Sequence, residues 1–344
     1  MIYSASYITA KNDFKYSYFF LKKHIIALIL GSAAMFLFSK IPYWKLKKLT
    51  YPLLILSFIL MIKVLFSSPI HGSRRWINLV FISFMPAELT KFSLNIFYAY
   101  FLSTYEKYRD DFTRGFVPAL LVLGIFDLLI LKQPDFSTTV IVTLTVFFVM
   151  YVGCINFLYL GVTLATGAVG AILVVMTAGY RMRRVNVWLH PLADRWDSGY
   201  QTVNSLITVG SGGIFGTGLG QSWGKMGHLP YQYNDYIFAV IGEELGLIGG
   251  VIIILLFLSF LWRGFMLSSG APDMFGILLG AGICFSIAFQ GFINISVVLN
   301  LLPATGLPLP FISYSGSSLV ITMASVGILL NISKFSKRSL RDGA

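Results

Sequence analysis

An aspartate, Asp235, stands just before the apolar run 239–262. A carboxylate at the mouth of a membrane span can act as a general base toward a hydroxyl group. The same position suits a helix cap, because Asp often caps the helix that follows it. The sequence leaves both roles of Asp235 open, and one side chain can fill both.

Two further carboxylates, Glu243 and Glu244, lie one to two helical turns further along the same run. Charged groups inside a span are costly and usually face a cavity or a partner. An ion pair with Lys91 or Lys63 and a role in substrate binding are both open for them. Glu88 lies three residues before Lys91, and this spacing favours pairing on one helix face.

Two adjacent arginines, Arg74 and Arg75, precede Trp76. Trp is common at the membrane interface, so this group can be an anchor. Arginine also suits bidentate contacts with phosphate, so the pair can equally bind a phosphate group. Another basic group flanks a span end, and solvation is its simpler interpretation: Arg181, Arg183 and Arg184.

A glycine-rich run occupies residues 210–222, GSGGIFGTGLGQS. It fits neither a P-loop nor a dinucleotide fingerprint, and no strand is predicted before it. It is typical of a tightly turning loop. Lys225, His228 and Asp197 share this part of the chain, but their spacing assigns them no role. The four histidines show no metal-ligand spacing, so no metal site is predicted from them.

The composition indicates which class of protein must position these residues. The chain has 344 residues, of which 56% are hydrophobic and 12% charged, whereas about a quarter of a soluble domain is charged. This excludes a disordered protein, a nucleic-acid-binding module and a secreted disulfide scaffold, and it predicts a polytopic membrane protein. The net charge of +12 fits cytoplasmic anchoring of loops or the binding of anions.

Nine apolar runs are long enough to cross a bilayer as helices. Because they are continuous rather than alternating, they predict an all-α transmembrane bundle and exclude a β-barrel. The nine predicted spans are 24–41, 51–67, 85–103, 115–132, 137–153, 158–178, 239–262, 273–295 and 313–332.

Short basic loops predict the orientation. The loops 42–50 and 104–114 and the C-terminal tail fall on one face, which is therefore cytoplasmic. An odd number of spans then puts residues 1–23 outside, with no signal peptide to carry them there. The loops 68–84 and 179–238 lie on the outer face, where their basic residues favour an anionic ligand. The residues that decide the orientation are Lys45, Lys47, Lys48, Lys107, Arg109, Arg114, Lys334, Lys337, Arg338 and Arg341.

Eight motifs together resemble the SEDS family of bacterial membrane proteins, which includes FtsW, RodA and SpoVE. The resemblance runs from Met1 to about Ser333, and the segment from Gly218 to Pro230 looks more like the cell-division branch, FtsW, than like RodA. The motifs occupy residues 72–77, 86–91, 133–135, 197–201, 210–222, 229–230, 234–246 and 302–318.

The resemblance implies a glycosyltransferase that polymerises lipid II, releases undecaprenyl diphosphate and works beside a class B penicillin-binding transpeptidase. It implies a single membrane domain over 1–344, in the bacterial cytoplasmic membrane, with partners in the division complex and none among nucleic acids. Family members have ten spans with both termini inside, and residues 1–6 match the end of the first of these spans. We therefore expect upstream in-frame codons for the rest of that span.

The resemblance also assigns roles to residues. Asp235 occupies the position of the essential aspartate of the family, so it is the predicted catalytic residue. A cationic group or a metal must take the charge that develops on the leaving pyrophosphate. The cofactor is left undetermined, with Mg²⁺ or Mn²⁺ as the candidate, and no residue is assigned as a metal ligand. The predicted substrate-binding residues are Arg74, Arg75, Glu88, Lys91, Lys225, Glu243, Glu244, Ser317 and Ser318.

Several positions depart from the family pattern. Tyr231 stands where the family has Glu, Tyr233 where His is common, and Asn234 where Thr is usual. Ala87 and Ser315 also differ from the usual residues. The change at Tyr231 matters most, because it removes a carboxylate close to Asp235.

Two other functions remain open. A transporter that flips lipid II would also carry intramembrane charges and broken helices, such as the proline-rich stretch before the last span. A scaffold that positions a transpeptidase would tolerate the loss of the outer acid. An acid on the outer face, as predicted for Asp235, favours chemistry over transport.

Overall fold

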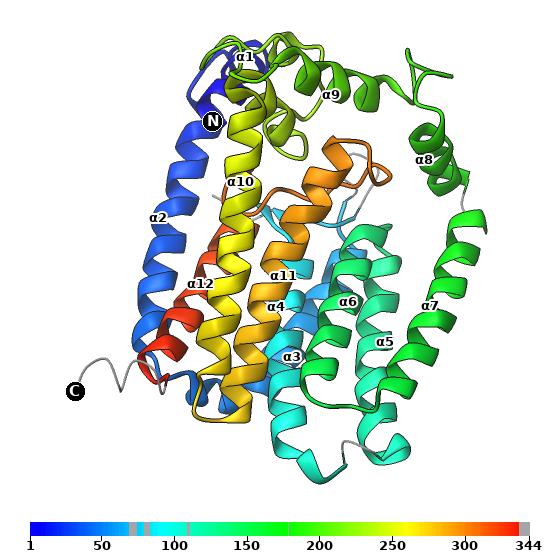
Figure 1. Cartoon of the computed structure of the whole chain (residues 1–344), viewed down its shortest axis with the longest axis vertical. Coiled ribbons are helices and arrows are strands. Elements are labelled where there is room, and N and C mark those ends of the chain that lie inside the picture. Colours follow the sequence, from blue (N-terminus) through cyan, green and yellow to red (C-terminus); the bar gives the residue numbers. More distant parts are fainter. Residues whose placement is uncertain (69–73, 79–82, 109–110, 178, 337–344) are drawn as a thin grey trace. The chain divides into compact units, whose positions relative to one another are not determined.

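The computed structural model describes residues 1–68, 74–78, 83–108, 111–177 and 179–336 (Figure 1). Some residues used in the sequence analysis lie outside these ranges. They are Gly72, Ser73, Arg109, Lys337, Arg338 and Arg341.

The described residues form twelve α-helices, and the predicted all-α class is confirmed. Each of the nine predicted spans falls on one of them. The sequence analysis did not predict α8 and α9, and of α1 it predicted only the end of a helix, at residues 1–6. The helices are α1 (Ile2–Phe14), α2 (Phe19–Lys40), α3 (Leu46–Leu65), α4 (Pro86–Thr104), α5 (Val117–Leu131), α6 (Phe136–Val152), α7 (Phe157–Thr177), α8 (Gly179–Leu189), α9 (Tyr200–Ser211), α10 (Ile237–Ser269), α11 (Met274–Val298) and α12 (Gly316–Lys334).

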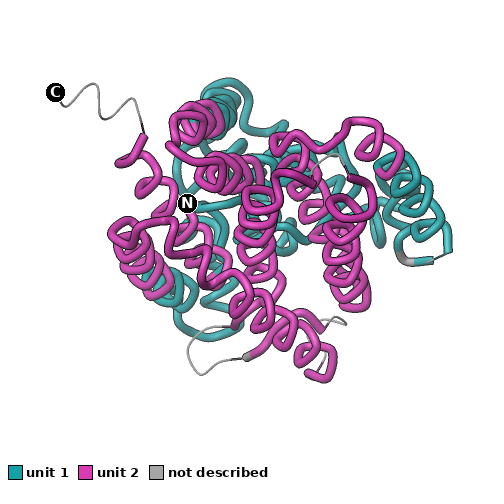
Figure 2. The backbone as a smooth tube through the Cα atoms, turned by 90° about the horizontal axis from the view of Figure 1, so that it is seen from below, with its two compact units in different colours: residues 1–25, 164–259, 288–315 teal, residues 26–163, 260–287, 316–344 magenta. Residues whose placement is uncertain are grey.

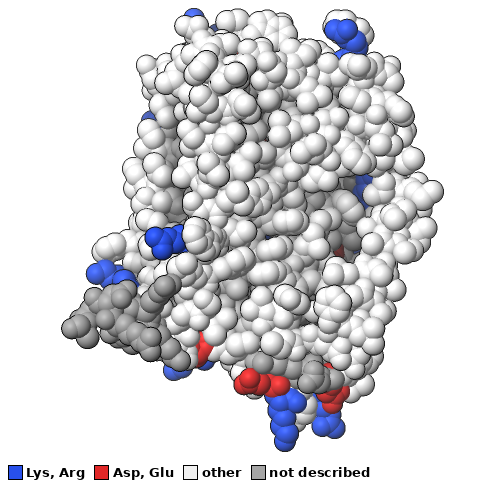
Figure 3. Space-filling model, in the orientation of Figure 1, with Lys and Arg blue, Asp and Glu red and all other residues white. Residues whose placement is uncertain are grey.

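Seven helical segments among the described residues are long and apolar enough to cross a membrane. The other two predicted spans are α6, which is apolar but has 17 residues, and α4, which carries Glu88 and Lys91. Figure 3 shows a face that is uncharged over most of its area, as expected where helices such as the largely exposed α10 contact lipid. The count of nine crossings stays a prediction.

Local chemistry explains where several elements begin. Pro86 is the first residue of α4, a position where proline lacks only an amide that has no partner in the helix. Asp135 caps α6, because its carboxylate accepts from the amide of Thr138 at 3.2 Å. In the predicted loop 68–84, β1 (Ile77–Asn78) pairs antiparallel with β2 (Ser83–Phe84).

The chain divides into two compact units, coloured separately in Figure 2. Unit 1 comprises residues 1–25, 164–259 and 288–315. Its hydrophobic core gathers residues 236–241 at the start of α10 with Ile295 and Val298 of α11. Ile2 and Ala5 of α1 and Leu309 belong to the same core, so sequence-distant segments surround residue 235.

Unit 2 comprises residues 26–163, 260–287 and 316–344. Here α4 packs against α3 and α6, and α5 packs against α6. The core of this unit contains the fully buried side chains of Leu94, Ile96 and Tyr98, all from α4. The apolar part of α4 therefore supports the charged pair at its first turns.

Candidate active site

The backbone at Asp235 is held by hydrogen bonds from other segments of unit 1. Asp235 is half-buried and lies two residues before the first residue of α10. The Nδ2 of Asn294 in α11 donates to the carbonyl oxygens of Asp235 and Leu307, each at 2.7 Å. The Oγ of Ser313 donates to the carbonyl oxygen of Asn234 at 2.6 Å. These contacts fix the chain on both sides of the predicted catalytic carboxylate.

Aromatic side chains surround this segment. The ring of Phe20 lies 4.4 Å from that of Tyr233 and 5.1 Å from that of Tyr314, between ring centroids. Burial raises the pKa of Tyr314 to about 12 and also raises the pKa of Tyr233. Burial and, to a smaller extent, the Asp235 carboxylate raise the pKa of Tyr236. These phenols stay protonated at neutral pH, so they can donate hydrogen bonds but cannot serve as bases.

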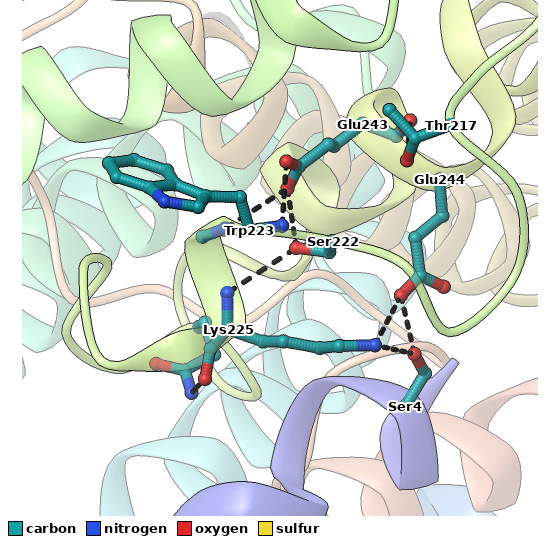
Figure 4. Close-up of polar contacts among 9 residues, drawn as sticks. Ser4, Thr217, Ser222, Trp223, Lys225, Glu243 and Glu244 are labelled. Atoms are coloured by element: carbon teal, nitrogen blue, oxygen red, sulfur yellow. Dashed lines mark hydrogen bonds and ion pairs between the residues drawn. The ribbon is translucent and has the colours of Figure 1, made fainter.

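The carboxylate of Glu243 organises the loop that follows the glycine-rich run (Figure 4). Its Oε1 accepts from the amide of Trp223 at 2.8 Å and from the Oγ of Ser211 at 3.2 Å. Its Oε2 accepts from the amide of Gly224 at 3.2 Å and from the Oγ of Ser222. Glu243 is buried, and four donors from its own chain satisfy it. This arrangement favours a positioning role.

Glu244 forms a buried ion pair with Lys225 (Figure 4). The Nζ of Lys225 lies 3.1 Å from Oε1 of Glu244 and 3.2 Å from the Oγ of Ser4, and Ser4 also donates to Glu244. The Lys225 side chain is 1% exposed, and its ammonium lies 5.5 Å from the ring centroid of Tyr7. Lys225 is therefore the partner of Glu244, whereas the sequence suggests a lysine of another span.

The helix α10 is broken immediately after these glutamates. Gly246 has φ 65° and ψ −166°, which releases the carbonyl oxygens of Glu243 and Glu244 from helical pairing. The amides of Thr217 and Gly218 donate to them at 2.9 and 3.1 Å. In return, the amide of Leu247 donates to the carbonyl oxygen of Gly213 at 2.9 Å. We call residues 210–224 the glycine-rich loop, and it satisfies the polar backbone that the break exposes.

In unit 2, the predicted phosphate-binding arginines contact backbone carbonyl groups. Arg75 donates from Nε to the carbonyl oxygen of Gln133 at 3.3 Å and from Nη2 to that of Pro134. Its Nη1 lies 3.7 Å from Oδ1 of the buried Asp135. Arg74 is exposed and donates to the carbonyl oxygen of the last residue of α3 at 2.9 Å. Arg75 thus holds the α5–α6 connection, while Arg74 keeps most of its guanidinium in solvent.

The predicted pairing of Glu88 with Lys91 is confirmed. The Nζ of Lys91 lies 2.9 Å from the Glu88 carboxylate, and both side chains are largely buried. At the start of α12, the Oγ of Ser317 accepts from the amide of Met85 at 3.2 Å, and Ser318 is buried. These contacts connect the beginning of α12 with the beginning of α4.

The predicted site residues thus form two groups, each inside one unit. Those of unit 1 are Asp235, Lys225, Glu243 and Glu244. Those of unit 2 are Arg74, Arg75, Glu88, Lys91, Ser317 and Ser318. The sequence analysis missed Asn294, Ser313 and Ser4. For Asn294 a signal existed, since an amide inside a long apolar span calls for a polar partner.

Among the described residues, no three His, Cys, Asp or Glu side chains come together as a metal site. Asp235 can supply one carboxylate ligand. Mg²⁺ is often bound by one or two carboxylates together with substrate phosphates. The residues present therefore fit a cation that is shared with a pyrophosphate, and not one held by a cage of protein ligands.

Comparison with known proteins decides the family. Residues 1–338 match the model of the FtsW, RodA and SpoVE family, described as cell cycle proteins. The chain belongs to this family. It is 41% identical to stage V sporulation protein E of Bacillus subtilis (strain 168), over 98% of this chain and 93% of that protein. It is 36% identical to the probable peptidoglycan glycosyltransferase FtsW of Geobacter sp. (strain M18), over 97% and 92%.

Solved structures agree with this FtsW, RodA and SpoVE membership. A chain from a peptidoglycan synthase complex, described as coordinating polymerization and crosslinking, matches with a TM-score of 0.79 and 27% identity. The match covers 97% of this chain and 94% of that one. RodA of Thermus thermophilus matches with a TM-score of 0.69 and 28% identity over the same shares. The motif-based resemblance to the SEDS family is confirmed, and the long apolar helices are those of an integral membrane protein.

Proposed function

We propose that this protein is a peptidoglycan glycosyltransferase that polymerises lipid II into glycan strands, with Asp235 as its catalytic carboxylate. The observation that carries the proposal is the segment at Asp235, whose backbone carbonyl groups accept hydrogen bonds from Asn294 and Ser313. A carboxylate on a backbone segment held in this way suits general-base chemistry. The FtsW relatives, which are named probable peptidoglycan glycosyltransferases, support the same reaction.

In the proposed reaction, a hydroxyl group of the acceptor sugar attacks the anomeric carbon of the donor. A carbon–oxygen bond forms there, and the bond from that carbon to the pyrophosphate oxygen breaks. The proton of the hydroxyl group passes to Asp235, and the electron pair leaves with undecaprenyl diphosphate. Arg74, Arg75 and Lys91 are the proposed cations for the departing charge, because guanidinium and ammonium groups stabilise such anions. A bound Mg²⁺ or Mn²⁺ would supply the same stabilisation.

The buried residues are proposed to act mainly through the loop that they hold. Glu243, Glu244 and Lys225 have partners within the protein, as described above, and this supports positioning of residues 222–225. Direct contact of these three residues with substrate stays a prediction, as it does for Glu88, Ser317 and Ser318. Substrate would reach them only by displacing internal hydrogen bonds.

The proposed setting is the bacterial cytoplasmic membrane at the division septum. The outer face carries loop 179–238 and the C-terminus is cytoplasmic. The proposed partner is a class B penicillin-binding transpeptidase, together with other membrane proteins of the division complex. The similar chain from a complex described as coordinating polymerization and crosslinking supports such a partner.

The test is polymerisation by the purified protein with its transpeptidase and lipid II, followed by gel analysis of glycan. Asp235→Asn keeps the shape and capping ability of the side chain but removes the base. We expect it to fold, to bind the transpeptidase and to lose activity by a factor on the order of 100 or more. Asp194→Asn is the matched control, because Asp194 is an exposed acid of the same long loop whose carboxylate accepts from Ser198.

Three outcomes would change the proposal. Substantial glycan from Asp235→Asn would remove this residue from catalysis. If the wild-type protein makes no glycan but moves lipid II across vesicle membranes, it is a transporter. If it does neither and still stimulates the transpeptidase, it is a scaffold.

A further inference from the structure

The glycine-rich loop belongs to an uncharged part of a segment predicted to lie outside the membrane. Residues 198–224 contain no Asp, Glu, Lys or Arg, although charged residues flank them at Asp197 and Lys225. This stretch covers α9 and the loop. A loop that is surrounded by water commonly carries charged residues. The lack of charge in residues 198–224 therefore indicates that this segment contacts an environment less polar than water.

The tip of this loop presents large apolar side chains outward. Phe215 is 82% exposed, Leu219 70% and Ile214 59%. Contiguous exposed apolar groups of this size mark contact with a protein, a ligand or a membrane. Glycines at 213, 216 and 218 have positive φ, so the backbone turns sharply and the apolar side chains project from a compact tip.

The apolar tip continues the lipid-facing side of α10. The amide of Ile248 donates to the carbonyl oxygen of Ile214 at 3.3 Å, next to the bond between Leu247 and Gly213. Leu247 and Ile248 are exposed, as are Ile252, Leu255 and Leu256 on the following turns. These α10 residues repeat at helical spacing and form one apolar face within unit 1. The loop is hydrogen-bonded to the end of that face and extends it.

The hydrogen bonds of the backbone in the glycine-rich loop indicate a shallow position in the membrane. The amides of Thr217 and Gly218 are used by α10, and the amide of Gly216 donates to Gly212 at 2.8 Å. Irregular backbone is not found exposed to lipid in the hydrocarbon interior, so a deep position is excluded. Trp223, at the end of the loop, is partly exposed, and Trp is enriched where hydrocarbon meets head groups.

We infer that the glycine-rich loop is a membrane anchor whose apolar tip, Ile214, Phe215 and Leu219, inserts into the acyl-chain boundary of the bilayer. Interfacial apolar side chains of this kind reach about 5–10 Å into the head-group and acyl boundary. The anchor fixes how deeply the glycine-rich loop lies in the membrane, and Glu243 and Glu244 connect this loop with α10. It does not depend on the proposed glycosyltransferase activity.

The test uses spin labels on single cysteines in the full chain, with Cys154→Ser and Cys284→Ala as background. The protein is reconstituted in vesicles of phosphatidylethanolamine and phosphatidylglycerol. Labels at Phe215→Cys and, separately, at Leu219→Cys are compared for collisions with oxygen, which concentrates in lipid, and with a water-soluble nickel chelate. Leu255→Cys on the apolar face of α10 is the lipid control, and Trp196→Cys, between charged residues, is the water control.

We expect both loop labels to behave like the label at position 255. Their collisions with the nickel chelate should be several-fold fewer than at position 196, and their collisions with oxygen several-fold more. Labels at 215 and 219 that both match the water control would overturn the inference. Because only lipid is present in the vesicles, the two outcomes are distinct.

Discussion

At the scale of single residues, unit 1 depends on buried charges that satisfy one another. Lys225 and Glu244 are almost completely buried, and Ser4 contacts both. Removing one partner of such a pair leaves an uncompensated charge, which typically costs about 3–5 kcal/mol. Replacing both partners by neutral side chains costs much less, because no charge is left buried.

We therefore expect Glu244→Gln to lower the melting temperature of the purified protein in detergent, by an amount that corresponds to a few kcal/mol. The double variant Lys225→Met with Glu244→Gln should recover a large part of that loss. The measurement is thermal unfolding of the wild type and both variants, together with Lys225→Met alone. Equal losses in the single and the double variant would show that the pair is not coupled.

The two adjacent arginines allow substrate binding to be separated from folding. Arg75 donates to two carbonyl groups of the α5–α6 connection, whereas Arg74 has one such contact. If both contact the pyrophosphate, each alanine variant should lose about 1.5–3 kcal/mol of binding, which is roughly a ten- to hundredfold rise in KM for lipid II. Only Arg75→Ala should also lower the melting temperature, because its loss frees two carbonyl groups of the α5–α6 connection and the buried carboxylate of Asp135.

KM measured with each variant, beside a melting curve and an assay of membrane insertion, checks this expectation. Arg75→Ala is expected to weaken lipid II use more than insertion. A variant with unchanged KM removes its arginine from the substrate site. A fall in melting temperature alone leaves Arg75 with a structural role.

At the scale of elements, the break in α10 requires a glycine. A Cβ at Gly246 would lie 2.4 Å from the amide nitrogen of Gly216 and from the carbonyl oxygen of Ile214, and the positive φ itself is unfavourable for other residues. Its φ of 65° and ψ of −166° lie in a region that essentially only glycine adopts, and holding another residue there costs about 1–3 kcal/mol. Gly250 in the same helix offers the control, since the nearest atom to its Cβ would be the ring of Phe238 at 3.4 Å.

We expect Gly246→Ala to destabilise the protein clearly and to loosen the glycine-rich loop, while Gly250→Ala stays close to the wild type. Thermal unfolding reports the first effect. Hydrogen exchange of the amides of Thr217 and Gly218 reports the second, because their acceptors are the carbonyl oxygens that the break frees. Equal behaviour of the two variants would mean that the break is not set by Gly246.

Most elements could be predicted from the sequence, and α9 shows why one of the others could not. The apolar runs marked the nine helices on which the predicted spans fall, and α10 shows why, since most of its 33 residues are apolar. The helix α9 has 12 residues without charge and lies in a segment that the charge pattern assigns to a loop. Its position depends on contacts with α10, and these cannot be inferred from local composition.

The site could be predicted only in part. Asp235 and the Glu88–Lys91 pair follow from local spacing and from the family motifs. The Ser4–Glu244 contact joins residues 240 positions apart, and neither segment contains a sequence pattern that predicts it. The sequence marks Gly246 as one of 32 glycines, and only the three-dimensional contacts with Ile214 and Gly216 show its role.

At the scale of the whole molecule, the orientation predicted from the basic loops can be tested in cells. A single cysteine at Trp196 in a Cys154→Ser, Cys284→Ala background should react with a membrane-impermeant maleimide added from outside, because loop 179–238 is predicted to be external. A cysteine at Lys45, in a predicted cytoplasmic loop, should react only after the membrane is opened. The reverse pattern would invert the orientation and place Asp235 on the cytoplasmic side.

The contact of α1 with Lys225 and Glu244 also constrains how the protein is made. Ser4 leaves the ribosome long before its partners, and at about 5–20 residues per second the 240 positions between Ser4 and Glu244 take roughly 12–48 seconds to translate. Until Lys225 and Glu244 have been made, Ser4 lacks both of its partners, and α1 remains without its final neighbours. A nascent chain that stops before residue 225 therefore cannot form the contacts of Ser4 with Lys225 and Glu244. Its α1 stays exposed to the proteases that remove incomplete membrane proteins.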